Sequence, residues 1–224
     1  MRNFAYILVN FSFLLLIIAG CQQQSEPPPV FQTAAEALRY NDRGVALAKT
    51  GDYDEAVIEF TKAIELNVDY TDAHINRGLT YMYLDEIDKA FSDFDRAIEI
   101  NPNDTGAYNY RGNIYSKNNN FDKAIEDYNV ALALNSNYTT AYNGRGNAYR
   151  QKGNFERAIA DYNRAIELSP DYALAYFNRA FAYRGMGNNA YAIDDFTKCI
   201  ELTTDPALAQ SARFEINEML SKPE

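Results

Sequence analysis

The sequence predicts an all-α fold, an α-solenoid in which pairs of helices repeat along the chain and stack on one another. An Arg followed by a small residue recurs every 34 residues, at Arg43-Gly44, Arg77-Gly78, Arg111-Gly112, Arg145-Gly146 and Arg179-Ala180. A fixed period of this length is typical of stacked supersecondary units rather than of one globular core. Each unit also contains two stretches with apolar residues at helical spacing, separated by a turn former such as Gly51 or Gly153.

Residues 1–20 are predicted to be an export signal. A basic residue, Arg2, precedes an apolar run that ends in small residues, and this order is typical of a cleaved leader. The segment Ile18-Ala19-Gly20-Cys21 resembles the lipobox of bacterial lipoproteins. In that family the Cys is lipidated and becomes the first residue of the mature chain. The alternative is an uncleaved membrane anchor, since the apolar run approaches the length that spans a bilayer.

The lipobox resemblance implies a chain held by Cys21 at the bacterial cell envelope, with the membrane as one partner. Gln22 after the Cys resembles the outer-membrane sorting pattern of enterobacterial lipoproteins. In a Gram-negative cell this implies the outer membrane, facing the periplasm. Residues 21–32 are then expected to form a polar, proline-containing tether that spaces the folded part from the lipid.

The first helix is expected to begin at Thr33, because Thr33-Ala34-Ala35-Glu36 has the form of a capping box. Five helix pairs follow. Small residues recur at the eighth, twentieth and twenty-seventh places of each pair, as at Gly146, Ala158 and Ala165, and let two helices approach closely. With the recurring Arg at the seventh place, the five repeats occupy 37–70, 71–104, 105–138, 139–172 and 173–206.

These repeats closely resemble the tetratricopeptide repeat, and the resemblance covers residues 37–206 with all five units in register. The fourth repeat has the family's residue types at its signature places, in Tyr142, Gly146, Tyr149, Gly153, Ala158, Tyr162, Ala165 and Pro170. The chain also departs from the family pattern. The seventh place holds Arg instead of Leu, the fourth holds Tyr or His74 instead of Trp, and the family's Pro survives only as Pro102 and Pro170.

Every recurring Arg has an acidic residue sixteen positions later. The five acidic residues are Glu59, Asp93, Asp127, Asp161 and Asp195. We expect a ladder of ion pairs that joins the first helix of each repeat to the second. The alternative is that the arginines bind an anionic ligand.

The segment from Ala207 to Leu220 is expected to form a final helix that covers the last repeat. It keeps the phase of the repeats, but Phe214 stands where the Gly would be. Residues 207–224 are therefore interpreted as a capping helix and tail, whose outer face should be polar because terminal units of an array face solvent.

The family resemblance also implies where a ligand binds, because in tetratricopeptide proteins the first helix of each unit lines a concave groove. Carried to this chain, the groove positions hold the polar residues Asn109, Asn113, Asn143, Asn147, Arg150 and Arg184, and the apolar residues Ile75, Leu79, Phe177 and Phe181.

Asn113 and Asn147 are expected to face this groove one repeat apart, where their amides suit the backbone of an extended peptide. The apolar residues of the groove either anchor ligand side chains or pack against neighbouring helices. Chaperone-binding members of the family hold a carboxylate with a Lys at the fifth place. Here that place holds Asn41, Ile75, Asn109, Asn143 and Phe177, so such a clamp is not expected.

Other functional classes have little support in the sequence. The net charge of −10 argues against nucleic-acid binding, which needs clustered Lys and Arg. The single His, His74, replaces a core aromatic, and Cys199 stands where the other repeats have Ala, so both are interpreted as buried packing residues. We find no Cys/His pattern for a metal, no phosphate-binding glycine loop and no catalytic set, so we expect no cofactor and no enzyme activity.

The sequence therefore predicts a non-enzymatic scaffold or adaptor at the bacterial envelope that binds a protein or peptide partner in its concave groove. Two alternatives remain open. One is a self-associating structural lipoprotein that forms a homodimer, and the other is an assembly factor of a pilus or secretion complex.

Overall fold

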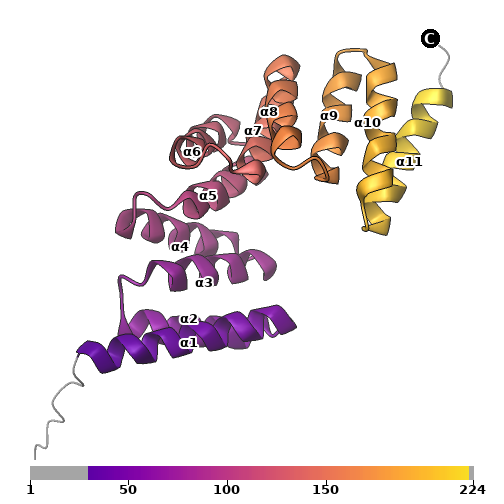
Figure 1. Cartoon of the computed structure of the whole chain (residues 1–224). Coiled ribbons are helices and arrows are strands. Elements are labelled where there is room, and N and C mark those ends of the chain that lie inside the picture. The colour runs from indigo at the N-terminus through magenta and orange to yellow at the C-terminus, as the bar shows by residue number, and fades with distance from the viewer. Residues whose placement is uncertain (1–29, 222–224) are drawn as a thin grey trace, which may run out of the picture.

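A computed structural model describes residues 30–221, and in this part of the chain every regular element is a helix. Figure 1 shows the helices stacked in chain order along a curved path, from α1 at the bottom to α11 at the upper right. The helices are α1 Val30–Thr50, α2 Tyr53–Leu66, α3 Thr71–Tyr83, α4 Ile87–Ile100, α5 Thr105–Lys117, α6 Phe121–Leu134, α7 Thr139–Gln151, α8 Phe155–Leu168, α9 Ala173–Gly185, α10 Asn189–Leu202 and α11 Pro206–Ser221.

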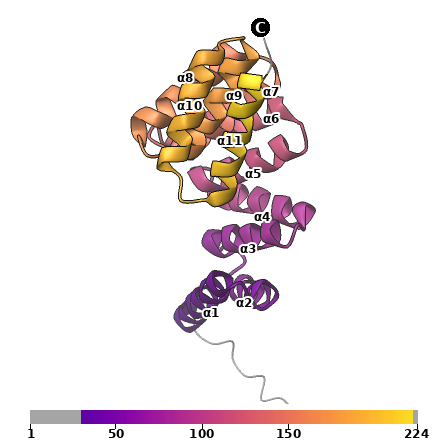
Figure 2. The same cartoon turned by 90° about the vertical axis from the view of Figure 1, so that its right-hand side faces the viewer.

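The arrangement confirms the predicted solenoid of five helix pairs with a C-terminal helix. Each helix packs mainly on its chain neighbours, and successive first helices also touch, as α5 and α7 do. Seen from the side in Figure 2, the stack rises from α1 and α2 without closing around a common centre. The core is therefore a thin continuous layer between helices, as expected for a repeat protein.

The turn inside each helix pair contains one residue with a left-handed backbone, always at the fifteenth place of the repeat. The φ angles there are +90° at Gly51, +58° at Asp85, +58° at Asn119, +76° at Gly153 and +76° at Gly187. Gly takes this conformation without a steric penalty, and Asn and Asp tolerate it better than other residues do. Asp85 is the one of these positions that was not recognised as a helix breaker from the sequence.

Small residues allow the helices of a pair to approach closely, as predicted. In the fourth repeat Ala158 and Ala165 are fully buried beside Tyr162. A Cβ atom built on Gly146 would lie 2.7 Å from Cε1 of the Tyr162 ring, so a larger residue fits where α7 crosses this ring only if the ring or helix shifts. The same relation between a Gly and an aromatic ring holds in the first three repeats.

The predicted ladder of ion pairs is present. Arg145 donates from Nε to Oδ2 of Asp161 at 2.8 Å and from Nη2 to Oδ1 at 2.6 Å. The same two-bond pairing joins Arg77 to Asp93, Arg111 to Asp127 and Arg179 to Asp195. These bonds tie the first helix of each repeat to the second, and two-bond pairing of this kind is the strongest form of the interaction.

The first repeat is the exception in this ladder. Arg43 reaches Oε2 of Glu59 from its Nε atom at 3.3 Å, and its side chain is 68% exposed. It lies on α1, and the described residues contain no second helix before α1 for it to contact.

In the other four repeats the same Arg also contacts the preceding repeat. Nη1 of Arg145 donates to Oδ1 of Asn129 on α6 at 2.7 Å. The corresponding partners of Arg77, Arg111 and Arg179 are Thr61, Asp95 and Asn163. Each of these arginines therefore joins three helices and two repeats, a role that was not predicted from the sequence.

The helix at each end differs in part from the prediction. The first helix begins at Val30, so Thr33 lies inside it and the predicted start there was wrong by three residues. The last helix, α11, begins at Pro206 and buries Ala212 against the fifth repeat. Its outer face is less polar than expected, because Phe214 and Leu220 are 61% and 70% exposed.

The predicted export signal, the lipobox with Cys21 and most of the predicted tether lie outside the described residues. Within residues 30–221, no helix combines the length and the apolar character that crossing a membrane requires.

Candidate functional site

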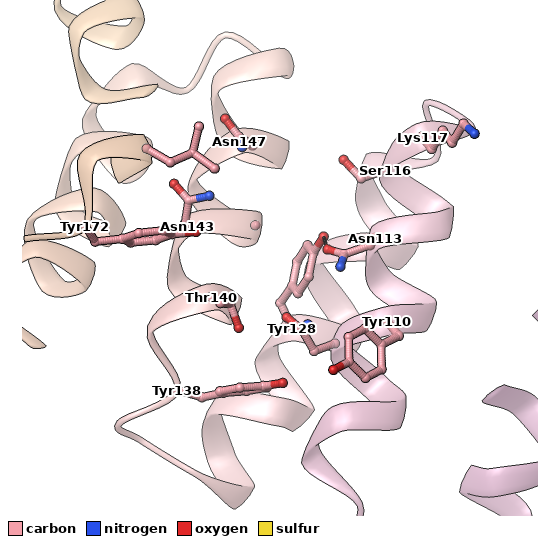
Figure 3. Close-up of a pocket in the computed structure, with 13 residues that line it drawn as sticks. Tyr110, Asn113, Ser116, Lys117, Tyr128, Tyr138, Thr140, Asn143, Asn147 and Tyr172 are labelled. Carbon is pink, nitrogen blue, oxygen red and sulfur yellow. Dashed lines mark hydrogen bonds between the residues drawn. The ribbon is translucent and has the colours of Figure 1, made fainter. Parts of the chain in front are cut away.

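A cleft of about 530 Å³ opens between α5 and α7, the first helices of the third and fourth repeats. The four predicted groove asparagines, Asn109, Asn113, Asn143 and Asn147, all line it. Figure 3 shows Asn113 on one wall of the cleft and Asn143 and Asn147 on the other. The helical spacing of four residues places each pair on one face of its helix, and the 34-residue period brings the two pairs together.

The amides of Asn113 and Asn147 are oriented by tyrosines on the second helices. The Tyr128 hydroxyl donates to Oδ1 of Asn113 at 2.7 Å, and the Tyr162 hydroxyl donates to Oδ1 of Asn147 at 2.8 Å. Each amide oxygen is thereby engaged, so the NH₂ group of each Asn is the part left to donate to a ligand. The cleft thus presents two oriented donors one repeat apart.

Both tyrosines carry the proton that they donate, and burial makes its loss still harder. Burial raises the pKa of Tyr128 well above its ordinary value, and the Asp127 carboxylate raises it further. Burial also raises the pKa of Tyr162, and the nearby Arg150 guanidinium offsets only part of that rise. Both phenols are therefore protonated at neutral pH and hold the amides in one orientation.

Asn109 and Asn143 lie deeper, and both are largely buried. Oδ1 of Asn143 accepts a hydrogen bond of 2.9 Å from Nδ2 of Asn178 in the next repeat. Oδ1 of Asn109 is buried and has no hydrogen-bond partner in the described part of the chain. Burial distinguishes this pair from Asn113 and Asn147, and the two members of the pair differ in how their oxygens are satisfied.

The lining of the cleft is almost neutral in charge and rich in side chains that form hydrogen bonds. No carboxylate lines it, and its single cation, Lys117, contacts Asp85 at 2.6 Å from Nζ to Oδ1. The remaining surface is contributed largely by phenols and hydroxyls, including Tyr110, Tyr138 and Tyr172. Such a surface suits uncharged groups that donate and accept hydrogen bonds, including the backbone of a peptide.

The predicted arginines lie further along the array, next to Phe181. The guanidinium carbons of Arg150 and Arg184 lie 5.6 and 4.9 Å from the centroid of this ring. Arg184 also forms an ion pair with Glu215 on α11, so the capping helix holds it. Neither Arg is among the residues that line the cleft.

The apolar residues of the predicted groove pack mainly against their own repeats. Phe177 and Phe181 meet Phe196 of α10 edge to face, with ring centroids 5.5 and 5.2 Å apart. Ile75 and Leu79 pack against the buried cluster around Phe94. All four residues therefore have packing partners within the chain.

Leu79 also lines a second cleft of about 400 Å³ between α1 and α3. Val45 lies across from it, and the rings of Tyr53 and Tyr83 stack at its edge with centroids 5.0 Å apart. This cleft is more apolar than the first and contains none of the four groove asparagines.

The tyrosines that orient the amides were not recognised as site residues from the sequence. Tyr162 was recognised only as a signature residue of the fourth repeat, and Tyr128 was given no role. A signal was present, because these two repeats have Tyr where the others have Phe, and the same two repeats have Asn at the ninth place.

The single His and the Cys of the described region, His74 and Cys199, are both buried. Nδ1 of His74 lies 3.1 Å from Oδ1 of Asp93, and Nε2 of His74 lies 3.1 Å from the carbonyl oxygen of Val68. Cys199 is also buried, and its burial raises the pKa of the thiol to about 11. Residues 30–221 contain no group of three or more His, Cys, Asp or Glu side chains placed to hold a metal.

Sequence models of one repeat family match the chain from residue 44 to residue 206. A model described as TPR repeat matches 44–85, 112–149 and 146–187. Models described as tetratricopeptide repeat match 71–104, 94–126 and 173–206. A search of curated proteins found no match.

Solved structures share the fold. One is the crystal structure of MamA protein, which is 26% identical in sequence. The match covers 74% of this chain and 91% of the MamA chain, with a TM-score of 0.64. MamA 41-end from Desulfovibrio magneticus RS-1 is 20% identical and covers 75% of this chain and 94% of its own, with a TM-score of 0.67. YrrB, described as a TPR protein with an unusual peptide-binding site, is 22% identical and covers 83% of this chain and 95% of its own, with a TM-score of 0.62.

Proposed function

The chain belongs to the tetratricopeptide repeat family, and we propose that it is a non-enzymatic scaffold that binds an extended peptide segment of a partner protein. The binding site is the cleft between α5 and α7. The partner's backbone runs along the first helices, and its carbonyl groups accept hydrogen bonds from Asn113 and Asn147.

One observation carries this proposal, namely the fixed orientation of the two amides. Tyr128 and Tyr162 occupy the oxygens of Asn113 and Asn147, so two donors are ready before a ligand arrives. A donor held in its bound orientation loses less conformational entropy on binding. Backbone carbonyls occur in every peptide, so this arrangement supports recognition of an extended chain with modest demands on its sequence.

A pull-down with matched variants tests this function. Full-length protein purified in detergent is immobilised and exposed to solubilised envelopes, and partners are quantified by mass spectrometry. The test variant is Asn113→Ala/Asn147→Ala. The control, Asn103→Ala/Asn137→Ala, makes the same change at the same 34-residue spacing on exposed loop positions.

We expect partners that the wild-type protein and the control retain in equal amounts and that the test variant loses. Direct titration of such a partner should then give a Kd that is raised about tenfold or more by the test variant, because two hydrogen bonds are removed. Equal retention by the test variant and the control would contradict the proposed site.

We also propose that the chain is anchored to the bacterial envelope by a lipid on Cys21 and faces the periplasm from the outer membrane in a Gram-negative host. The lipobox sequence supports this proposal. Metabolic labelling with a palmitate analogue should mark the wild-type protein but not the Cys21→Ser variant. Equal labelling of both proteins, or an intact leader by mass spectrometry, would contradict the anchor.

A second candidate function is self-association, and the exposed Phe214 and Leu220 on α11 favour it. Sedimentation at several concentrations distinguishes it from the scaffold. A tight dimer that dissociates in a Phe214→Ser/Leu220→Ser variant would favour self-association, whereas a monomer would favour the scaffold. A role in assembling a pilus or secretion complex would be one use of the scaffold, to be decided by the identity of the captured partner.

A further inference from the structure

Two of the junctions between neighbouring repeats each contain a hydrogen bond between two asparagines. Nδ2 of Asn76 donates to Oδ1 of Asn41 at 3.0 Å, and Nδ2 of Asn178 donates to Oδ1 of Asn143 at 2.9 Å. In both pairs the acceptor is at the fifth place of one repeat and the donor is at the sixth place of the next. A buried carboxamide oxygen is thus satisfied by a second carboxamide from the neighbouring repeat.

The junction between the third and fourth repeats has the acceptor but lacks this donor. Asn109 occupies the fifth place and is only 3% exposed, whereas the sixth place of the next repeat is Gly144. Oδ1 of Asn109 is consequently buried without a partner in the described structure. Leaving a buried acceptor unpaired costs free energy, which a donor from outside the chain recovers.

The remaining junction contains no such unpaired oxygen. Ile75 stands at the fifth place of the second repeat and presents no polar atom. Tyr110 stands at the sixth place of the third repeat and stacks on Phe94, with ring centroids 5.4 Å apart. Asn109 is therefore unlike the residues at the corresponding places of the other described junctions.

The chain's own packing prevents a side chain at position 144 from supplying the donor. A Cβ atom on Gly144 would lie 2.7 Å from Cζ and 2.9 Å from the hydroxyl oxygen of Tyr128. The Tyr128 ring occupies this space, and its hydroxyl is already bonded to Asn113. Asn109 also lines the cleft, so the cleft is the route by which a donor from outside the chain can approach it.

We propose that the cleft is a specificity pocket for a carboxamide side chain, Asn or Gln, of the bound peptide. The ligand NH₂ group donates to Oδ1 of Asn109, as Asn178 donates to Asn143 at the next junction. The ligand oxygen accepts from Nδ2 of Asn113. This inference rests on the peptide-binding function proposed above and adds to it the chemistry of one ligand side chain.

The electrostatics of the cleft favour a carboxamide over the other side chains of similar length. A carboxylate would meet one cation, Lys117, which already contacts Asp85, and an ammonium group would meet no carboxylate in the lining. An aliphatic side chain would leave Asn109 unpaired. Because the Asn109 oxygen is covered in the unbound structure, binding includes an adjustment of side chains, which is common at interfaces even where the backbone stays in place.

Selection from a phage-displayed library of random 12-residue peptides tests this inference. The bait is the full chain in detergent. We expect enriched peptides that share an Asn or Gln at one position, and synthetic peptides with Leu or Ala at that position should bind with a Kd about tenfold higher.

Two variants place at this junction the residues that other junctions of the chain have. Because the two variants differ, the test does not depend on either one folding correctly. The variant Tyr128→Phe/Gly144→Asn reproduces the pairing of Phe60 with Asn76, and Tyr128→Phe alone controls for the lost hydroxyl. The variant Asn109→Ile reproduces Ile75. Circular dichroism confirms that each variant is folded. The carboxamide preference should disappear in the double variant and in Asn109→Ile. In Tyr128→Phe the overall affinity should fall, because Asn113 loses its orienting bond, but peptides with Asn or Gln should still bind more tightly than those with Leu or Ala.

The possible outcomes separate this inference from the function on which it rests. Enriched peptides without a shared carboxamide, or a preference that survives Asn109→Ile, would overturn the specificity pocket and leave peptide binding in place. A selection that enriches no peptide on the wild-type chain would count against both.

Discussion

The third and fourth repeats and the first two repeats share a framework but differ in the surface they present. Position nine is Asn113 and Asn147 in the middle repeats, where position twenty-four is Tyr. In the first two repeats position nine is Val45 and Leu79, and position twenty-four is Phe. Asparagine amides therefore line the middle cleft at place nine, whereas Val45 and Leu79 take the same place in the cleft between the first two repeats.

This difference shows how a repeat protein varies its surface on a constant framework. The framework residues recur because every pair of helices must pack in the same way. The residues at places nine and twenty-four change together because a Tyr hydroxyl beneath the surface needs an acceptor, and an aliphatic neighbour offers none. A coupled change at two positions converts an apolar face into a hydrogen-bonding one while the fold is kept.

The largest predicted effect tests whether the framework is common to both regions. Arg145→Leu should leave Asp161 buried without its charge partner and lower the free energy of unfolding by about 3–5 kcal/mol. Arg77→Leu should have a similar effect in the second repeat. Arg43→Leu, with an exposed guanidinium and a single contact, should cost about 1 kcal/mol or less.

Urea unfolding followed by circular dichroism measures all three variants. If Arg145→Leu kept full stability and lost its peptide or protein partner, the ladder would instead be a ligand site, which is the alternative that the sequence left open.

A smaller effect is expected from Gly144→Ala at the middle cleft. The added Cβ atom would overlap the Tyr128 ring, and overpacking of this kind costs about 1–3 kcal/mol. Gly106→Ala is the matched control on the preceding first helix, where the nearest atom lies at 3.3 Å on the Asp104 side chain. That substitution should be neutral or stabilise the helix by up to about 1 kcal/mol.

Thermal unfolding of the two variants gives the comparison. Equal Tm values for Gly144→Ala and Gly106→Ala would show that the close approach of Tyr128 to α7 is not needed.

Exchanging Tyr and Phe at place twenty-four between the middle repeats and the first two tests whether this place depends on the residue at place nine. Tyr162→Phe should lose the bond to Asn147, which stabilises the fold by about 0.5–1.5 kcal/mol. The reverse exchange, Phe94→Tyr, should also destabilise, because its new hydroxyl would lie beside Leu79 without an acceptor. Two stabilised variants in chemical unfolding would contradict the proposed coupling.

The smallest predicted effect is a difference in the sign of pH dependence between the second and fourth repeats. Burial raises the pKa of Asp93, but hydrogen bonds from Arg77 and His74 outweigh it and leave the pKa below its usual value of 3.8. Asp93 therefore stabilises the fold above pH 3.8, and this stability is lost as the pH falls through its folded pKa.

Asp161 behaves in the opposite way. Burial raises its pKa above 3.8, and the bonds from Arg145 offset only part of that rise. The contribution of Asp161 therefore declines as the pH rises from 3.8 through its folded pKa.

Unfolding free energies of Asp93→Asn and Asp161→Asn, measured against the wild-type protein between pH 3 and 6, check these signs. The loss of unfolding free energy in Asp93→Asn, relative to the wild-type protein, should grow as the pH rises. The corresponding loss in Asp161→Asn should shrink. Parallel curves would refute the assignment.

The sequence was sufficient to predict what repeats within one unit. The helix pairs, the buried small residues and the bond from Arg145 to Asp161 all follow from a period that can be read along the chain. It did not reveal contacts that cross between units. Examples are the bond from Arg145 to Asn129 and the missing partner of Asn109, which depend on how one repeat is rotated onto the next.

Local conformation also limited the prediction at two places. Asp85 adopts a left-handed turn that Asp tolerates but does not signal as Gly does. The first helix continues back to Val30, so the capping-box pattern at Thr33 did not mark its start.

The central claim is that a partner lies in the cleft between α5 and α7. Site-specific photo-cross-linking in the native host tests it most directly, with the photoreactive residue placed either at Ser116, which lines the cleft, or at Glu126, which is exposed on α6. We predict that a discrete partner is captured from position 116, that none is captured from position 126, and that Asn113→Ala/Asn147→Ala weakens the capture. Equal capture from both positions, or capture from position 126 alone, would contradict the account.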